Sequence, residues 1–146
     1  MENLRSNGPG RILVIERDPA VSRFVEFVLG NWEAFNVVSE AKLDLALGRA
    51  KHELWDLILI DFELPSPEGA DGLDAMGLLA AIHAARPQLP VAMLTASPVT
   101  GPVTGPAAGR LQAADGHVTK PIIPSHLIGL ATTLIEYSRR THEQAS

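Results

Sequence analysis

The stretch that decides the fold is Leu57-Ile58-Leu59-Ile60-Asp61, the clearest strand signal in the sequence. Four consecutive apolar residues of this kind are typical of a strand buried on both faces, as in a parallel sheet covered by helices. The run ends at an acid. The sequence therefore predicts a central strand with a carboxylate at its carboxyl end, which makes Asp61 the first candidate functional residue.

Short apolar runs and segments with helical spacing alternate along the rest of the chain. We expect further strands over residues 11–15, 35–39, 91–94 and 117–119. We expect helices from Pro19 to a stop at Gly30-Asn31, over residues 42–52, 72–85 and 107–114, and from Pro124 onward. This alternation predicts an α/β fold with a single five-stranded parallel sheet, doubly wound as (βα)5, with helices on both faces.

The composition excludes several classes of protein. The 146 residues include no cysteine, which rules out disulfides, thiolate zinc sites and a cysteine nucleophile. The net charge is -5, and no basic run exceeds Arg139-Arg140, so we expect no nucleic-acid partner. No apolar stretch reaches the ~18 residues of a membrane span, and the N-terminus lacks an apolar signal segment. We therefore expect a cytoplasmic protein with no membrane contact.

The two ends of the chain differ from its middle. Residues 1–10 are polar and contain Gly8-Pro9-Gly10, so we expect a disordered leader. Residues 11–140 form the predicted domain, and the polar residues 141–146 are expected to be a flexible tail. Because the sequence ends soon after the last predicted helix, we expect a stand-alone domain whose output passes through a partner.

Polar residues stand where the predicted strands end. Glu16 follows the first strand, Asp61 ends the third, Thr95 ends the fourth and Lys120 ends the fifth. Carboxyl ends of parallel strands meet at one edge of a sheet, so we expect these side chains to lie together. A carboxylate nucleophile, a hydroxyl donor and a cation suit phosphoryl transfer to an aspartate. A magnesium ion would offset the repulsion between neighbouring carboxylates and the phosphoryl group.

Five segments at this edge resemble the response-regulator receiver family of two-component signalling, over about residues 11–140. In chain order they are Ile12-Leu13-Val14-Ile15-Glu16-Arg17-Asp18-Pro19, Asp56-Leu57-Ile58-Leu59-Ile60-Asp61-Phe62-Glu63-Leu64-Pro65, Asp71-Gly72-Leu73, Met93-Leu94-Thr95-Ala96 and Ala114-Asp115-Gly116-His117-Val118-Thr119-Lys120-Pro121. The resemblance implies a flavodoxin-like fold with strand order 2-1-3-4-5.

The resemblance also implies a role for each matching residue. Asp61 matches the phospho-accepting aspartate, and Thr95 matches the hydroxyl residue that follows the phosphoryl group on activation. Lys120 matches the lysine that pairs with that group, and the bond from Lys120 to Pro121 is typically cis in the family. Mg²⁺ would be held by Glu16, by Asp61 and by the backbone carbonyl of Glu63.

Arg17 departs from the family pattern, because the family has a second acid there that usually binds the metal directly. A guanidinium cannot bind magnesium. One hypothesis is that Glu16 and Asp61 still hold a weak metal, with Arg17 turned outward or Asp18 substituting for the missing acid. The other is that Arg17 pairs with Asp61 and replaces the charge of the metal, giving a pseudo-receiver.

Two further positions differ from the family. Glu63 places an acid near the route of a water that would attack the phosphoryl group, so we expect altered dephosphorylation of either sign. His117 stands where the family usually has an aromatic switch residue. It could change rotamer and respond to pH, or it could simply be a half-exposed histidine on an edge strand.

The leading hypothesis is a response-regulator receiver that is not itself an enzyme. It would accept a phosphoryl group on Asp61 from a histidine kinase or histidine phosphotransfer protein, and would signal through a downstream protein or a homodimer. The alternative is a phosphorylation-independent pseudo-receiver that acts as a protein-binding module. A phosphohydrolase is disfavoured, because Glu63 stands where such an enzyme would carry a second aspartate.

Overall fold

Five parallel strands form one sheet in the order β2-β1-β3-β4-β5 in the computed structural model, which describes residues 10–32, 35–63, 74–96 and 114–145. The strands are β1 (Arg11–Ile15), β2 (Asn36–Glu40), β3 (Leu57–Asp61), β4 (Val91–Thr95) and β5 (Gly116–Thr119). The predicted fold class and strand order are therefore confirmed. The second strand begins and ends one residue later than its apolar run suggested.

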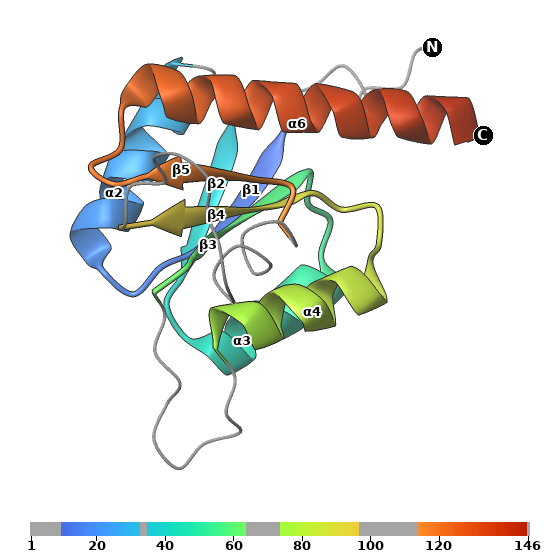
Figure 1. Ribbon diagram of the computed structural model, residues 1–146, viewed down its shortest axis with the longest axis horizontal. Helices are drawn as coiled ribbons and strands as arrows, with labels where there is room; N and C mark the ends of the chain where they lie inside the picture. Colours follow the sequence, from blue (N-terminus) through green and yellow to red (C-terminus); the bar gives the residue numbers. More distant parts are fainter. Residues whose placement is uncertain (1–9, 33–34, 64–73, 97–113, 146) are drawn as a thin grey trace, which may run out of the picture.

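Helices cover both faces of this sheet (Figure 1). They are α2 (Pro19–Phe27), α3 (Leu43–His52), α4 (Ala75–Ala85) and α6 (Pro124–Ala145). Helices α2 and α6 pack on one face, and α3 and α4 pack on the other, so each face of the sheet has its own apolar core.

The central strands supply both cores by simple alternation. In β3, Ile58 and Ile60 point into the core beneath α3 and α4, while Leu57 and Leu59 point into the core beneath α2 and α6. All of these side chains are fully buried. Burial on both faces explains why the strand reads as a continuous apolar run and not as an alternating one.

Capping residues start two of the helices. The carboxylate of Asp18 accepts a hydrogen bond from the amide of Ala20 at 2.9 Å, and Pro19 is the first helical residue, as the sequence predicted. Helix α4 is capped by Asp74, whose carboxylate accepts from the amide of Gly77 at 2.8 Å. This cap places the start of α4 at Ala75, later than the predicted residue 72.

The predicted stop at Gly30-Asn31 is wrong. The backbone continues from α2 as a π-helical segment, η1 (Val28–Trp32), and the amide of Phe35 then donates to the carbonyl of Leu29 at 3.1 Å. Val28 and Leu29 are buried in the core beneath α2 and α6. Their burial outweighs the cost of about 1 kcal/mol that glycine adds to a helix interior.

Other boundary predictions meet the structure only in part. Gly10, expected in the leader, is buried, and its carbonyl accepts a hydrogen bond from the amide of Asn36 at 2.9 Å. The disorder predicted for residues 1–9 and nearly all of the helix predicted over 107–114 lie outside the described residues. Helix α6 continues to Ala145, so residues 141–145 are helical, while their flexibility stays a prediction.

Candidate functional site

Three of the predicted site residues meet at the carboxyl edge of the sheet. The ammonium nitrogen of Lys120 lies 3.2 Å from Oε1 of Glu16 and 3.3 Å from Oδ1 of Asp61. Glu16 is 2% exposed and Asp61 is 7% exposed. These residues come from the ends of β1, β3 and β5, so the parallel register of the sheet brings them together as expected.

Burial and neighbouring charges shift the pKa values of Lys120 and Glu16. Burial alone would lower the pKa of Lys120, but the negative charges of Asp61 and Glu16 more than offset it, so the pKa of the lysine is raised. Burial raises the pKa of Glu16, and the nearby charge of Asp61 raises it further. The backbone amide of Asp18 donates to Oε2 of Glu16 at 3.2 Å and opposes this rise in pKa. Lys120 is therefore held as a cation between two carboxylates.

One oxygen of the Asp61 carboxylate receives two hydrogen bonds. Oδ1 accepts from the ammonium of Lys120 and from the backbone amide of Glu63, the latter at 3.1 Å. Both contacts fall on the same oxygen, and together they fix the orientation of the carboxylate.

Thr95 contacts Glu63 as well as lying at the end of β4. Thr95 is 1% exposed, and its hydroxyl donates to Oε2 of Glu63 at 3.4 Å. The backbone amide of Ala96 donates to Oε1 of the same carboxylate at 2.9 Å. Glu63 therefore links the ends of β3 and β4. That Glu63 lies near the route of an attacking water stays a prediction, and the sequence did not predict these two donors.

Arg17 is exposed and makes no ion pair with any described residue. Lys120, not Arg17, occupies the place beside Asp61. The carboxylate of Asp18 caps α2 by accepting a hydrogen bond from the amide of Ala20, and this contact does not favour the metal role considered for Asp18. These contacts favour the hypothesis in which Arg17 points outward over the one in which it pairs with Asp61.

The donor set suits magnesium only in part. Glu16 and Asp61 both approach one cation, the ammonium of Lys120, and Mg²⁺ in proteins often has one or two carboxylate ligands and several waters. However, the described ranges contain no cluster of three or more Asp, Glu, His or Cys side chains that could hold a metal. The described residues therefore offer two carboxylates for a metal, those of Glu16 and Asp61, and the carbonyl of Glu63 stays a predicted ligand.

The remaining predicted features lie close by. His117 is exposed on β5, which is an edge strand of the sheet. This position agrees with the simpler interpretation of that histidine, and a switching role stays a prediction. The peptide bond between Lys120 and Pro121 is cis, as the resemblance implied.

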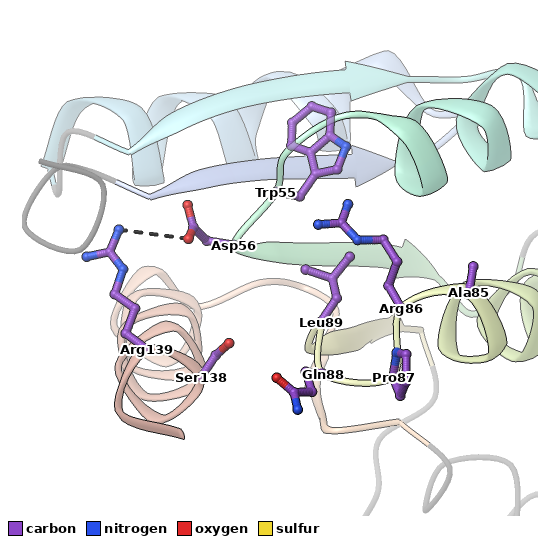
Figure 2. A pocket seen from close by; sticks show the side chains of 9 residues that line it. All are labelled: Trp55, Asp56, Ala85, Arg86, Pro87, Gln88, Leu89, Ser138 and Arg139. Carbon is purple, nitrogen blue, oxygen red and sulfur yellow. Dashed lines mark ion pairs between the residues drawn. The ribbon is translucent and has the colours of Figure 1, made fainter. Parts of the chain in front are cut away.

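A pocket of about 420 Å³ lies at the opposite, amino edge of the sheet (Figure 2). Arg86 donates from Nη1 to the carbonyls of Ala50 at 3.0 Å and Glu53 at 2.5 Å, and Asp56 pairs with Arg139 at 3.9 Å. The residues that line the pocket are Trp55, Asp56, Ala85, Arg86, Pro87, Gln88, Leu89, Ser138 and Arg139. Both arginines contact neighbouring elements, and none of the pocket's lining residues is among the predicted site residues at the carboxyl edge.

Two aspartates at the same amino edge accept hydrogen bonds from the first amides of neighbouring strands. Oδ2 of Asp56 accepts from the amide of Arg11 at 2.7 Å, where β1 begins. Oδ2 of Asp115 accepts from the amide of Val91 at 2.8 Å, where β4 begins. Neither residue is among the predicted site residues, although each stands just before a strand.

In the described ranges, no helix is long and apolar enough to cross a membrane.

The chain matches a known protein family over most of its length. The model of the response regulator receiver domain family matches residues 12–132. Among curated proteins, the phosphate regulon transcriptional regulatory protein PhoB of Klebsiella pneumoniae is 35% identical over 118 residues, covering 81% of this chain and 48% of PhoB. The probable transcriptional regulatory protein TcrX of Mycobacterium tuberculosis is 29% identical over 118 residues, covering 80% and 46%. The chain spans about half the length of these relatives.

Solved structures agree on the fold. A CheY-like response regulator receiver domain protein from Methanospirillum hungatei JF-1 superposes with a TM-score of 0.74 at 23% identity, covering 92% of this chain and 99% of that one. The receiver domain of the sensor histidine kinase PA1611 from Pseudomonas aeruginosa PAO1 has a TM-score of 0.72 at 24% identity, covering 88% and 98%. That second structure has a magnesium ion coordinated in its active site cleft.

Proposed function

Because the chain belongs to the response regulator receiver domain family, we propose that Asp61 accepts a phosphoryl group from a phosphohistidine. The donor would be a histidine kinase or a histidine phosphotransfer protein. The observation that carries this proposal is the position of the Lys120 ammonium, which contacts both Asp61 and Glu16 at the carboxyl edge of the sheet. The family match supports the same assignment.

In the proposed reaction, a carboxylate oxygen of Asp61 attacks the phosphorus atom. The new O–P bond forms as the N–P bond to the donor imidazole breaks, and the imidazole leaves with the electron pair of that bond. Lys120 balances the negative charge that gathers on the phosphoryl oxygens. The hydroxyl of Thr95, at the end of the neighbouring strand, is the proposed hydrogen-bond donor to one of those oxygens.

Magnesium is the proposed cofactor, as in the magnesium-bound receiver domain of PA1611. Glu16, Asp61 and the carbonyl of Glu63 would hold it. When bound, the ion would neutralise part of the charge on the transferred group. Arg17 is exposed, and its positive charge would oppose the ion.

The proposed output is a contact with a downstream protein or with a second copy of the chain. In this proposal the protein is a phosphoryl acceptor and not an enzyme that turns over a substrate. We also keep the prediction that it binds no nucleic acid. PhoB and TcrX are transcriptional regulators by name, and this chain spans only about half of each, so that prediction needs its own binding measurement.

The second candidate function is that of a pseudo-receiver, which binds partners without phosphorylation. Two observations favour it. Arg17 replaces an expected acid, and the carboxylate of Glu63 already accepts hydrogen bonds from Thr95 and Ala96. In a pseudo-receiver, the binding surface would not depend on any modification of Asp61.

Incubation with acetyl phosphate, with and without Mg²⁺, tests the proposal by intact mass. We expect a magnesium-dependent gain of one phosphoryl group, which Asp61→Asn abolishes and the exposed-site control Asp44→Asn retains. A receiver known to be labelled runs in parallel. If that receiver is modified and this protein is not, the pseudo-receiver takes the place of the leading proposal.

A further inference from the structure

The side chain of Glu63 reaches from the end of β3 to the end of β4. Its two carboxylate oxygens accept from different donors: Oε2 from the hydroxyl of Thr95 at 3.4 Å, and Oε1 from the amide of Ala96 at 2.9 Å. The backbone amide of Glu63 donates to Oδ1 of Asp61 at 3.1 Å. One residue therefore touches the proposed acceptor with its backbone and the neighbouring donors with its carboxylate.

These two donors have the chemistry that a phosphoryl group needs. A hydroxyl and a backbone N–H that converge on one anion form an oxyanion site, and such donors stabilise the oxygens of a transferred phosphoryl group. A carboxylate and a phosphoryl group are both oxyanions, and each donor has a single hydrogen to give. The same donors cannot fully satisfy both groups at once.

We propose that the carboxylate of Glu63 is an internal competitor of the phosphoryl group on Asp61. In the unmodified protein it occupies the donors of Thr95 and Ala96, and it must leave them before a phosphoryl group can take its place. This inference rests on the proposed function, because it assumes that Asp61 is the acceptor.

The exposure of Glu63 makes the competition reversible. Glu63 is exposed, whereas Asp61 and Thr95 are buried. Hydrogen bonds of an exposed carboxylate exchange readily with water, so its side chain can swing outward without unpacking the core. Its charge also opposes the approach of a phosphoryl donor that carries the same sign. Glu63 should therefore slow modification without preventing it.

The experiment compares wild type, Glu63→Ala, Glu63→Gln and the control Glu136→Ala, which removes an exposed acid from α6. The first readout is the rate of adduct formation with acetyl phosphate and Mg²⁺. We expect Glu63→Ala to react about tenfold faster than wild type, which corresponds to a small decrease in the activation free energy of phosphorylation. Glu63→Gln should lie between them, because its amide oxygen keeps one acceptor and loses the charge. Glu136→Ala should match wild type.

The second readout is the amide proton shift of Ala96 in the unmodified protein, measured by ¹⁵N-resolved NMR. Loss of the carboxylate acceptor should move this signal upfield in Glu63→Ala and leave it unchanged in Glu136→Ala. A loss of folding would broaden or shift signals throughout the spectrum, and Glu63→Gln keeps the size of the side chain as a second test. An Ala96 shift with an unchanged adduct rate would overturn the competitor role.

The outcomes separate this inference from the proposed function. An adduct on wild type that forms no faster in Glu63→Ala leaves the function standing and overturns the inference. An adduct that forms on Glu63→Ala and barely on wild type supports both. No adduct on any variant overturns the proposed function and the inference together.

Discussion

Glu16 and Lys120 are 104 positions apart in the sequence, yet their side chains meet at 3.2 Å, on a carboxylate that is 2% exposed. A buried carboxylate loses its hydration, so it needs a counter-charge. Lys120 provides that charge for Glu16 and for Asp61 at the same time. The stability of the site and its chemistry therefore depend on the same ammonium group.

Replacing Lys120 by methionine should destabilise the protein at neutral pH. The substitution keeps the length of the side chain but leaves Glu16 and Asp61 buried without their cation. We expect the free energy of unfolding to fall by about 2 kcal/mol. Urea denaturation measures it, with Lys42→Met as the control, since Lys42 is exposed and its side chain forms no cap. Equal losses in the two variants would contradict this role for Lys120.

Alkaline pH should weaken the wild-type protein through the same lysine. The pKa of Lys120 is raised in the folded state by the charges of Asp61 and Glu16, which outweigh the effect of burial. The folded protein therefore binds this proton more tightly than the unfolded chain does. The resulting stabilisation is complete below the unfolded pKa of about 10.4 and is lost as the pH rises through the folded pKa.

Urea midpoints of wild type and Lys120→Met, measured over a series of alkaline pH values, check this expectation. The difference between the two proteins should shrink as the pH rises. A constant difference would mean that Lys120 stabilises the fold by packing and not by charge.

Replacing Arg17 by aspartate should strengthen magnesium binding. The variant adds a third acid beside Glu16 and Asp61 and removes a positive charge. We expect the dissociation constant for Mg²⁺ to fall by about tenfold, as measured by isothermal titration calorimetry. Arg140→Asp makes the same charge change at an exposed position late in α6 and should leave the affinity unchanged. Equal affinities for wild type and Arg17→Asp would show that Arg17 does not oppose the metal.

Removing the carboxylate of Asp56 should cost stability without altering the acceptor chemistry. The variant Asp56→Ala loses the hydrogen bond from the amide of Arg11 at 2.7 Å and the ion pair with Arg139. We expect a loss of about 1 kcal/mol in the free energy of unfolding, because the first amide of β1 loses its hydrogen-bond partner. The rate of acetyl phosphate labelling should stay at the wild-type value. A slower rate in the folded variant would show that Asp56, at the amino edge of the sheet, affects the chemistry of Asp61 at the carboxyl edge.

The sheet and the meeting of Glu16, Asp61 and Lys120 could be predicted because they follow from periodicity. A strand buried on both faces reads as a continuous apolar run, and parallel strands place their ends together. The stop at Gly30 could not be predicted in the same way. Whether a glycine ends a helix depends on the packing of its neighbours, and here Val28 and Leu29 are buried.

The contacts of the Glu63 side chain could not be predicted for a different reason. Its hydrogen bonds with Thr95 and Ala96 depend on how far β3 and β4 extend relative to each other and on the side-chain rotamer of Glu63. Neither of these leaves a pattern in the sequence. The hydrogen bonds that Asp56 and Asp115 accept from the first amides of β1 and β4 had a weak local signal, an acid just before a strand. That signal alone does not say which amide will be the donor.

The alternation of side chains in β3 has a consequence for how the molecule opens. Since β3 sends Ile58 and Ile60 into one core and Leu57 and Leu59 into the other, neither layer of helices can detach without exposing part of the same strand. The two cores should therefore behave as one cooperative unit. The amide hydrogens of β3 should be among the slowest to exchange with deuterated water, and their exchange should require unfolding of the whole domain.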